Sequence, residues 1–318
     1  MVAAATRWLV SRRGLTHIAL VAGPWIAVRP TTPSSLIAPP SRTRVVILGS
    51  GTPNADPDHS GPAVAIVVDS TAYMVDAGAG IVRRAALAAR TDSIPALDPS
   101  RLGRVFVTHL HSDHTLGMPD LILTPWVLGR TTPLDVYGPP GTARMLDLLE
   151  QAYSADIAIR LRGGEPSNKT GYAATAHDVR PGVVYRDSKV TVTAFEVPHG
   201  KWEHAYGYVF KTSDRTIVVS GDTKKSEAVQ RACNRCDVLV HEVFSPEQLK
   251  KRTPDWQAYH TAYHTSTYEL GDLAARSRPK LLVLYHQLGW GDDDAELVRQ
   301  VRTRYGGVVV SGRDLGVY

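Results

Sequence analysis

The stretch HLHSDH at residues 109–114 places three imidazoles and a carboxylate within six positions. It directly follows an apolar run at 105–107, whose β-branched and aromatic side chains predict a buried strand. Residues two apart in an extended chain point the same way, so His109, His111 and Asp113 are expected on one face and the last histidine off it. Imidazole suits a borderline ion such as zinc, and carboxylate suits a harder one. Because histidine fills only 12 of 318 positions, the stretch predicts a metal site rather than a polar loop with chance histidines.

Three further motifs follow in the chain. Pro198-His199-Gly200 and Leu284-Tyr285-His286 each place a histidine after an apolar stretch, and Ser220-Gly221-Asp222-Thr223 places an aspartate after another. In this order the four motifs resemble the signature of the metallo-β-lactamase superfamily, from about Val45 to the C-terminus. The resemblance implies an α/β fold in the form of a four-layer αββα sandwich, whereas periodicity alone predicts only a sheet-rich α/β protein.

The resemblance also implies a site for two metal ions. We expect two zinc ions, although the same ligand types accept manganese or iron. In two-metal hydrolysis the ions lie roughly 3.5–4 Å apart and hold a bridging hydroxide at neutral pH. The implied ligands are His109, His111 and His199 for the first ion, Asp113, His114 and His286 for the second, and Asp222 as the bridge.

Two more motifs narrow the chemistry. Val240-His241-Glu242-Val243-Phe244 and His264-Thr265-Ser266-Thr267 resemble segments of the ribonuclease Z-like branch, the second of which supplies a histidine that protonates the leaving oxygen. Such a donor needs an imidazole with a pKa near neutrality, oriented and charged by a carboxylate. We therefore expect His264 and Glu242 to be catalytic, with Asp113 also orienting the hydroxide. The alternative is that His264 only precedes a helix whose N-cap is Thr265.

Charge is distributed unevenly along the chain. Residues 1–44 hold six arginines and no acidic residue, whereas the remainder holds 30 basic and 31 acidic residues. A nearly neutral body argues against a broad phosphate-binding surface for nucleic acid. The Pro-x-Lys-x-Arg-Asn loop that reads the tRNA end in ribonuclease Z is not found after Gly51, and no long basic arm precedes His199. The expected partner is therefore a small-molecule or short ester substrate, and extended nucleic-acid binding is disfavoured.

The predicted function is that of a di-zinc hydrolase. It would cleave a phosphodiester or a related aryl sulfate or phosphate ester, as a ribonuclease Z-like or arylsulfatase-like enzyme does. The alternatives are a tRNA 3′-end endonuclease and a hydrolase of lactones, lactams or thioesters, because the fold alone does not set the substrate. For the assembly, the sequence offers only the general expectation of a homodimer, the commonest soluble assembly.

Residues 1–43 are predicted to form a signal-like or disordered segment before a hydrolase domain at 44–318. Paired arginines at 12–13 precede an apolar stretch at 14–28 and a Pro/Ser-rich run at 29–41. This order is typical of an export signal, although His17, Gly23 and Pro24 interrupt the apolar part. We expect an exported, periplasmic protein, with a cytoplasmic one as the alternative. The stretch is too short and broken to span a membrane.

Periodicity and turn residues predict the elements of the domain. Strands are expected at 45–48, 63–68, 72–75, 105–107, 134–137, 182–186, 190–196, 206–211, 216–219, 237–240 and 280–284. Helices are expected at 81–90, 117–128, 143–153, 224–232, 266–276 and 294–304, with an irregular stretch at 160–181. Asp76 begins a Gly-rich turn without dinucleotide spacing and, by the resemblance, packs beneath the metal site.

The remaining notable residues have no predicted catalytic role. Cys233 and Cys236 form a lone C-x-x-C with too few ligands for a structural zinc site, which leaves a local disulfide or two thiols. Six residues in predicted loops are expected at the surface or in packing roles, and several could line a pocket for an apolar leaving group. They are His59, Trp202, His204, Trp256, His260 and Trp290.

Overall fold

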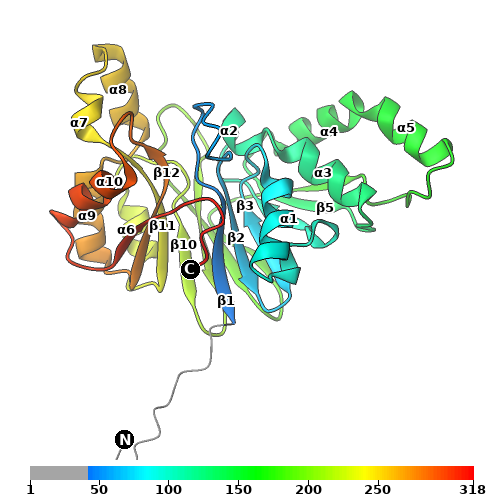
Figure 1. Ribbon diagram of the computed structural model, residues 1–318, viewed down its shortest axis with the longest axis horizontal. Helices are drawn as coiled ribbons and strands as arrows, with labels where there is room; N and C mark the ends of the chain where they lie inside the picture. The colour runs from blue at the N-terminus through cyan, green and yellow to red at the C-terminus, as the bar shows by residue number, and fades with distance from the viewer. Residues whose placement is uncertain (1–41) are drawn as a thin grey trace, which may run out of the picture. The chain divides into compact units, whose positions relative to one another are not determined.

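A computed structural model describes residues 42–318, which form two β-sheets flanked by helices (Figure 1). The predicted segment 1–43 lies outside the described residues except for its last two. Within the described residues, no helix is both long and apolar enough to cross a membrane.

The first sheet has six strands in sequence order. They are β1 (Thr43–Gly49), β2 (Ala63–Val68), β3 (Thr71–Val75), β4 (Arg104–Phe106), β5 (Leu134–Gly138) and β6 (Ala174–Asp178). β1 to β3 pair antiparallel, and β3 to β6 pair parallel. The helical connections are α1 (Ile81–Thr91), two short 3₁₀ turns (Pro95–Leu97 and Pro99–Arg101), α2 (Ser112–Thr115), α3 (Met118–Val127), α4 (Thr142–Ala152) and α5 (Ser154–Arg162).

The second sheet has seven strands in the order β13-β12-β11-β10-β9-β8-β7. They are β7 (Gly182–Arg186), β8 (Thr191–Glu196), β9 (Tyr206–Lys211), β10 (Thr216–Val219), β11 (Val238–Phe244), β12 (Leu281–Leu288) and β13 (Val309–Ser311). β10 to β13 pair parallel, so their carboxyl ends lie at one edge. The helices of this half are α6 (Glu227–Ala232), α7 (Pro246–Leu249), α8 (Pro254–Tyr263), α9 (Thr267–Ser277) and α10 (Asp294–Arg302).

Three apolar clusters establish the layers. The central one joins side chains from both sheets, such as Ile66 and Phe106 with Tyr208 and Val240. A second lies between the first sheet and α1, α3 and α4, and a third between the second sheet and α6, α9 and α10. The alternation of inward and outward apolar residues within strands requires cover on both faces of each sheet. The predicted αββα sandwich is confirmed.

Most predicted elements are present, and the errors concern segments with little burial. The predicted irregular stretch at 160–181 contains the end of α5 and the edge strand β6, neither of which was expected. α8, placed in a loop by the sequence, is a helix with no buried residue. Its neighbour α9 begins at an N-cap formed by Ser266, whose hydroxyl and Glu269 make a capping box, so the prediction of Thr265 as N-cap is wrong. Cys233 and Cys236 form a disulfide between α6 and β11.

Candidate metal centre and active site

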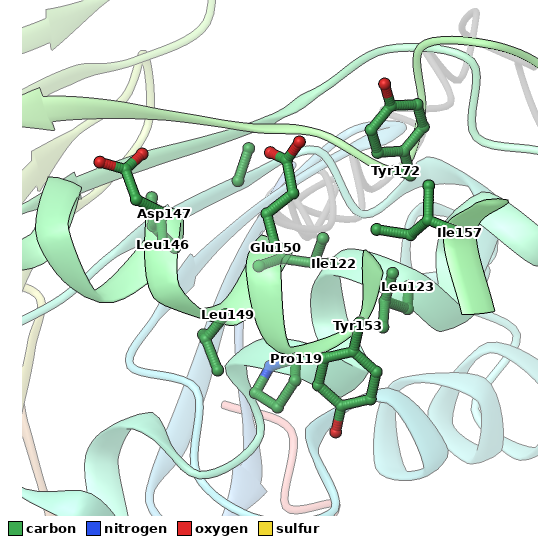
Figure 2. Close-up of a pocket in the computed structure, with 11 residues that line it drawn as sticks. Pro119, Ile122, Leu123, Leu146, Asp147, Leu149, Glu150, Tyr153, Ile157 and Tyr172 are labelled. Carbon is green, nitrogen blue, oxygen red and sulfur yellow. The ribbon is translucent and has the colours of Figure 1, made fainter. Parts of the chain in front are cut away.

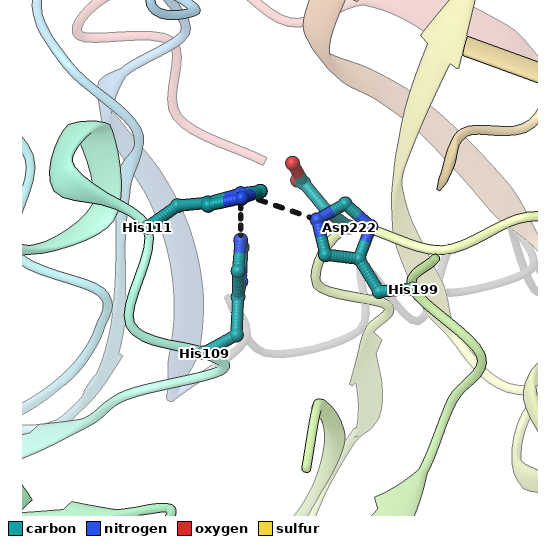
Figure 3. A group of neighbouring side chains, drawn as sticks. All are labelled: His109, His111, His199 and Asp222. Carbon is teal, nitrogen blue, oxygen red and sulfur yellow. Dashed lines mark hydrogen bonds between the residues drawn. The ribbon is translucent and has the colours of Figure 1, made fainter. Parts of the chain in front are cut away.

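Three overlapping groups of candidate metal-ligand side chains lie where the strands of both sheets end, and the third, Asp222, His264 and His286, shares two members with the others. The first group consists of His109, His111, His199 and Asp222 (Figure 3). Nε2 of His109 lies 2.9 Å from Nδ1 of His111, and Nε2 of His199 lies 3.2 Å from the same nitrogen. The structure thus turns three imidazole nitrogens toward one point, between the loop after β4 and the loop after β8.

The second group consists of Asp113, His114 and His286. Nε2 of His286 lies 3.2 Å from Oδ2 of Asp113, and Nε2 of His114 lies 3.4 Å from the same oxygen. Asp222 lies between the groups, because its Oδ1 is 3.4 Å from His114 and its Oδ2 is 3.5 Å from His286. All seven residues predicted as ligands are therefore brought together, and Asp222 has the central position expected of a bridge.

Backbone irregularities place two of these side chains. His286 occupies a β-bulge in β12, since Glu242 pairs with Tyr285 and Val243 with Gln287, and its φ is 45°. A bulge re-aims a side chain toward the neighbouring face, and here it turns the imidazole into the site. Gly221 precedes Asp222 with φ 62°, and a Cβ there would lie 2.7 Å from the Tyr206 carbonyl oxygen. Only glycine fits this close approach.

The prediction of a common strand face for His109, His111 and Asp113 is wrong in its geometry. β4 already ends at Phe106, and His111 is the N-cap of the short helix α2, which carries Asp113 and His114. The segment therefore curls around the site, and all three histidines and the aspartate reach it. Strand alternation alone could not have shown this.

Asp76 lies directly beneath the site, as expected. Its carboxylate accepts hydrogen bonds from the Thr108 amide at 2.8 Å and the Thr108 hydroxyl at 2.9 Å. Its Oδ2 also lies 2.8 Å from Nδ1 of His114. A carboxylate on one ring nitrogen fixes the tautomer, so the other nitrogen of His114 is directed to the site with its lone pair.

The electrostatics of the donor set fit bound cations. Burial lowers the pKa of His199 to about 4 and that of His109 well below its ordinary value, so both imidazoles are neutral, the form that ligates metals. Burial also opposes charge on His114, but Asp222, Asp76 and Asp113 outweigh it and raise its pKa. The carboxylates thus favour positive charge at this spot. Buried Nε2 of His114 and Oδ1 of Asp222 have no hydrogen-bond partner among the described residues, as expected of atoms that face an ion.

Glu242 and His264 face each other beside these groups. Nδ1 of His264 lies 3.4 Å from Oε2 of Glu242 and 3.9 Å from Oδ2 of Asp222, and neither Nδ1 nor Oε2 makes a hydrogen bond within residues 42–318. The other Glu242 oxygen accepts from the amides of Thr265 and Thr223. Burial raises the pKa of Glu242 well above its ordinary value and lowers that of His264 to about 4. These shifts favour the neutral form of each group, so the expectation of an imidazole with a pKa near neutrality that is charged by the carboxylate is wrong.

A cavity of about 330 Å³ lies beside these groups and is lined by Asp113, Asp222, His264 and His286. A volume of this size accommodates a ligand. Its lining includes Trp256, His260 and Trp290, three of the six residues that the sequence marked as possible pocket residues. Arg252 also lines it and was missed, because a single arginine in a polar stretch carries no pattern.

The other marked residues have separate places. Trp202 lies against the first group, and its indole nitrogen donates to Nε2 of His111 at 2.8 Å. His59 lines an adjoining cavity of about 390 Å³. His204 stacks on Tyr206.

A further cavity lies between α3, α4 and α5 (Figure 2). Its volume is about 20 Å³, room for about one water. Figure 2 shows Leu146 and Leu149 of α4 and Ile122 of α3 in its lining, with the carboxylates of Asp147 and Glu150 nearby. None of the clustered histidines lines it, so the chemistry resides at the metal-ligand groups.

Comparison with known proteins agrees with this arrangement. Residues 71–287 match the family model described as the beta-lactamase superfamily domain. A ribonuclease Z of Mycobacterium bovis is 28% identical over 283 residues, which cover 85% of this chain and 96% of that protein. A ribonuclease Z of Mycobacterium marinum is likewise 28% identical, over 284 residues that cover 85% of this chain and 96% of that protein.

Solved structures show the same fold. The metallo-beta-lactamase fold protein YhfI from Bacillus subtilis superposes with a TM-score of 0.67 at 16% identity, covering 87% of this chain and 98% of that one. The short form of human tRNase Z has a TM-score of 0.64 at 20% identity, covering 86% of this chain and 98% of that one. At these identities the likeness concerns the fold alone.

Two predictions from the sequence are wrong. The chain was expected to act on a short ester, with nucleic-acid binding disfavoured. Its relatives are ribonucleases Z, and the similarity covers 96% of the length of the first of them. The expectation of export conflicts with the same similarity, and the segment on which it rested lies outside the described residues except for Arg42 and Thr43. The first expectation rested on the neutral charge of residues after 44 and on two missing motifs, and neither reports the chemistry of the site itself.

The family match spans residues 71–287 and so includes both metal-ligand groups and the Glu242–His264 pair. The chain belongs to the beta-lactamase superfamily and is a metal-dependent hydrolase.

Proposed function

We propose that the protein is a di-zinc phosphodiesterase that acts on RNA, as an endonuclease at the 3′ end of precursor tRNA. The observation that carries the proposal is the juxtaposition of the metal-ligand groups with the buried carboxylate–imidazole pair of Glu242 and His264. The similarity to ribonucleases Z over 96% of their length supports RNA as the substrate.

In this proposal His109, His111 and His199 would hold one ion, Asp113, His114 and His286 would hold the other, and Asp222 lies between the two groups. When bound, two divalent ions supply a hydroxide at neutral pH and neutralise charge on the scissile phosphate. The neutral imidazoles of His109 and His199 need no proton removed before they ligate, and Asp76 keeps His114 in the ligating tautomer.

His264 then acts as the proton donor. Its imidazole passes the proton of the Glu242–His264 pair to the leaving oxygen, and Glu242 holds the ring in place through its 3.4 Å contact. The backbone amides of Thr223 and Thr265 fix the Glu242 carboxyl group, so the donor is positioned before substrate binds.

The test is cleavage of a precursor tRNA by the zinc-loaded protein and by His264→Ala. We expect wild type to cleave at the 3′ end and the variant to lose about 10²- to 10⁴-fold in kcat. A nitrophenyl phosphodiester, whose leaving group departs without protonation, should lose much less in the same variant. His177→Ala serves as control. His177 lies on the edge strand β6, where it pairs with Asp135 of β5 and belongs to none of the metal-ligand groups.

Two outcomes would contradict the proposal. Cleavage of the nitrophenyl ester without cleavage of any precursor tRNA would leave a small-ester hydrolase instead. An equal loss on both substrates in His264→Ala would assign His264 to metal binding or structure, and Glu242→Gln would then be expected to retain the precursor tRNA rate. An arylsulfatase-like activity stays a prediction, which nitrophenyl sulfate tests in the same assay.

A further inference from the structure

An aromatic wall lines the cavity on the side of the proton donor. The rings of Trp256 and His260 on α8 are nearly parallel, with centroids 5.5 Å apart and an angle of 22°. The ring centroid of His260 lies 4.5 Å from that of Trp290. Trp256 is 53% exposed, so its ring is accessible to a ligand in the cavity that it lines.

The wall has a defined position relative to the reacting groups. The ring centroid of His260 lies 5.4 Å from that of His264, and Trp290 follows the end of β12, which carries His286. Burial lowers the pKa of His260 to about 4, and the charge of Arg252 acts in the same direction. His260 is therefore a neutral ring at physiological pH and presents a stacking face rather than a charge.

Arg252 supplies a cation at the same place. Its guanidinium lies 5.3 Å from the centroid of Trp290. The ion pairs of residues 42–318 include none for Arg252, so its charge is not neutralised by a carboxylate of the described chain. Arg252, Trp290 and Asn54 line both this cavity and the adjoining one of about 390 Å³, so the two cavities are neighbours.

Trp290 is held in a costly backbone conformation. Its φ is 48°, a left-handed value that bulky residues seldom adopt, between Gly289 and Gly291. The conformation places the indole between the guanidinium of Arg252 and the ring of His260. Strain of this kind persists where surrounding structure enforces it, and it is concentrated at functional sites.

We propose that Trp256, His260, Trp290 and Arg252 form a nucleotide subsite, in which the base of the leaving nucleoside stacks on the aromatic wall and Arg252 contacts an adjacent phosphate. This inference rests on the proposed function. Every base has a π-face, so stacking gives affinity with little sequence preference, while a guanidinium matches phosphate oxygens in a bidentate manner. The wall lies beside the proton donor, so it serves the nucleoside whose oxygen leaves. Arg252, in the segment before α8, would therefore make the phosphate contact. The loop after β1, in which the tRNA-reading motif is not found, would not.

The test compares matched RNA substrates with the full-length, zinc-loaded protein. One substrate carries a base on the leaving nucleoside, and the second is abasic at that position. In Trp256→Ala we expect the kcat/KM ratio between the two to fall about tenfold, mainly through KM, because base stacking contributes that order of affinity. Tyr153→Ala, an exposed ring in the lining of the small α4 cavity, should keep the wild-type ratio.

The cation is tested with a third substrate, in which a neutral methylphosphonate replaces the phosphate next to the scissile bond. The preference of wild type for the charged substrate should fall about tenfold in Arg252→Ala. It should persist in Arg304→Ala, whose guanidinium lies 6.0 Å from the ring of Tyr268 and not in the cavity. Unchanged ratios in both Trp256→Ala and Arg252→Ala would overturn the subsite while leaving the proposed function intact.

A direct binding measurement separates the two proposals if wild type cleaves no RNA. Adenosine, with ribose as its control, is titrated into the zinc-loaded protein while tryptophan fluorescence is recorded. Quenching by adenosine that is lost in Trp256→Ala would support the subsite even if the nuclease proposal failed. Equal behaviour of adenosine and ribose would overturn the subsite.

Discussion

At the scale of single residues, Asp76 illustrates how a ligand is oriented by a group that touches no ion. It connects the Thr108 amide at the end of β4 with Nδ1 of His114. We expect Asp76→Asn to weaken zinc binding about tenfold, since partners of ligating histidines contribute 10- to 100-fold. Competition with a chromophoric chelator measures this. Asp135→Asn removes a similar carboxylate–imidazole contact at 2.9 Å outside the site, and an equal loss there would contradict the assignment.

Asp187 is a residue on which the stability of the fold in acid depends. Burial alone would raise its pKa, but hydrogen bonds from Tyr73, from the amides of Lys189 and Val190 and from Tyr185 lower it. The folded carboxylate therefore stabilises the protein above the unfolded pKa of about 3.9, and this stability disappears as the pH falls through the lower folded value.

We expect Asp187→Asn to lower the free energy of unfolding by about 2 kcal/mol at pH 7, with a smaller difference from wild type near pH 3. Urea denaturation at both pH values provides the measurement. A difference that grows on acidification would show that the sign is wrong. Asp58→Asn, an exposed aspartate in the loop after β1, is the control and should show no such dependence.

At the scale of secondary-structure elements, burial decides what the sequence could reveal. β2 and β8 were predicted because apolar side chains face one or both sides, whereas β6 has no fully buried residue and no apolar alternation to detect. α8 also buries none of its residues, so its aromatic side chains resembled a loop. The bulge at His286 left no local signal either, because it depends on pairing with β11. The ligands were predictable from motifs, and the three rings of the aromatic wall were marked as possible pocket residues, but the cation Arg252 was not.

One buried arginine contacts the middle of α3. The guanidinium of Arg130 donates to the carbonyls of Leu121 and Ile122 in α3, and to those of Leu102 and Gly171 in two neighbouring loops. Replacing it by methionine would leave four carbonyls without this donor.

We expect Arg130→Met to lower the free energy of unfolding by about 3 kcal/mol, because buried acceptors would lose their partner. Arg83→Ala removes a largely exposed ion pair with Asp120 at 3.4 Å and should change it by less than about 0.5 kcal/mol. Chemical denaturation of both variants tests the contrast. Similar small changes in the two would show that Arg130 does not hold α3 in place.

At the scale of the whole molecule, the candidate ions would connect the two sheets. The loop after β4 in the first sheet contributes ligands, and so do β12 and the loops after β8 and β10 in the second. Binding that occurs only in the folded state stabilises it by about 2.7 kcal/mol when free ligand exceeds Kd a hundredfold. We expect chelator treatment to lower the melting temperature and added zinc to restore it. Melting curves that coincide with and without zinc would contradict a metal site that spans the sheets.

The overall architecture was predictable because ordered motifs with metal-ligand spacing specify it, whereas the substrate class was not. Residues after 44 carry nearly equal numbers of basic and acidic side chains, which suggested that nucleic acid is not the substrate. A total charge does not show where individual cations stand. Arg252, exposed beside Trp290 and without an acidic partner among the described ion pairs, illustrates how a neutral protein can still present a local cation.

The disulfide between Cys233 and Cys236 makes site-specific labelling of the protein possible. The chain contains only these two cysteines, and no free thiol remains. A cysteine introduced in place of Ile159, which is 71% exposed on α5, would therefore be the sole target for a maleimide reagent under non-reducing conditions. A spin label there, combined with a paramagnetic ion bound by the histidines, would give the separation between that helix and the reacting centre in solution.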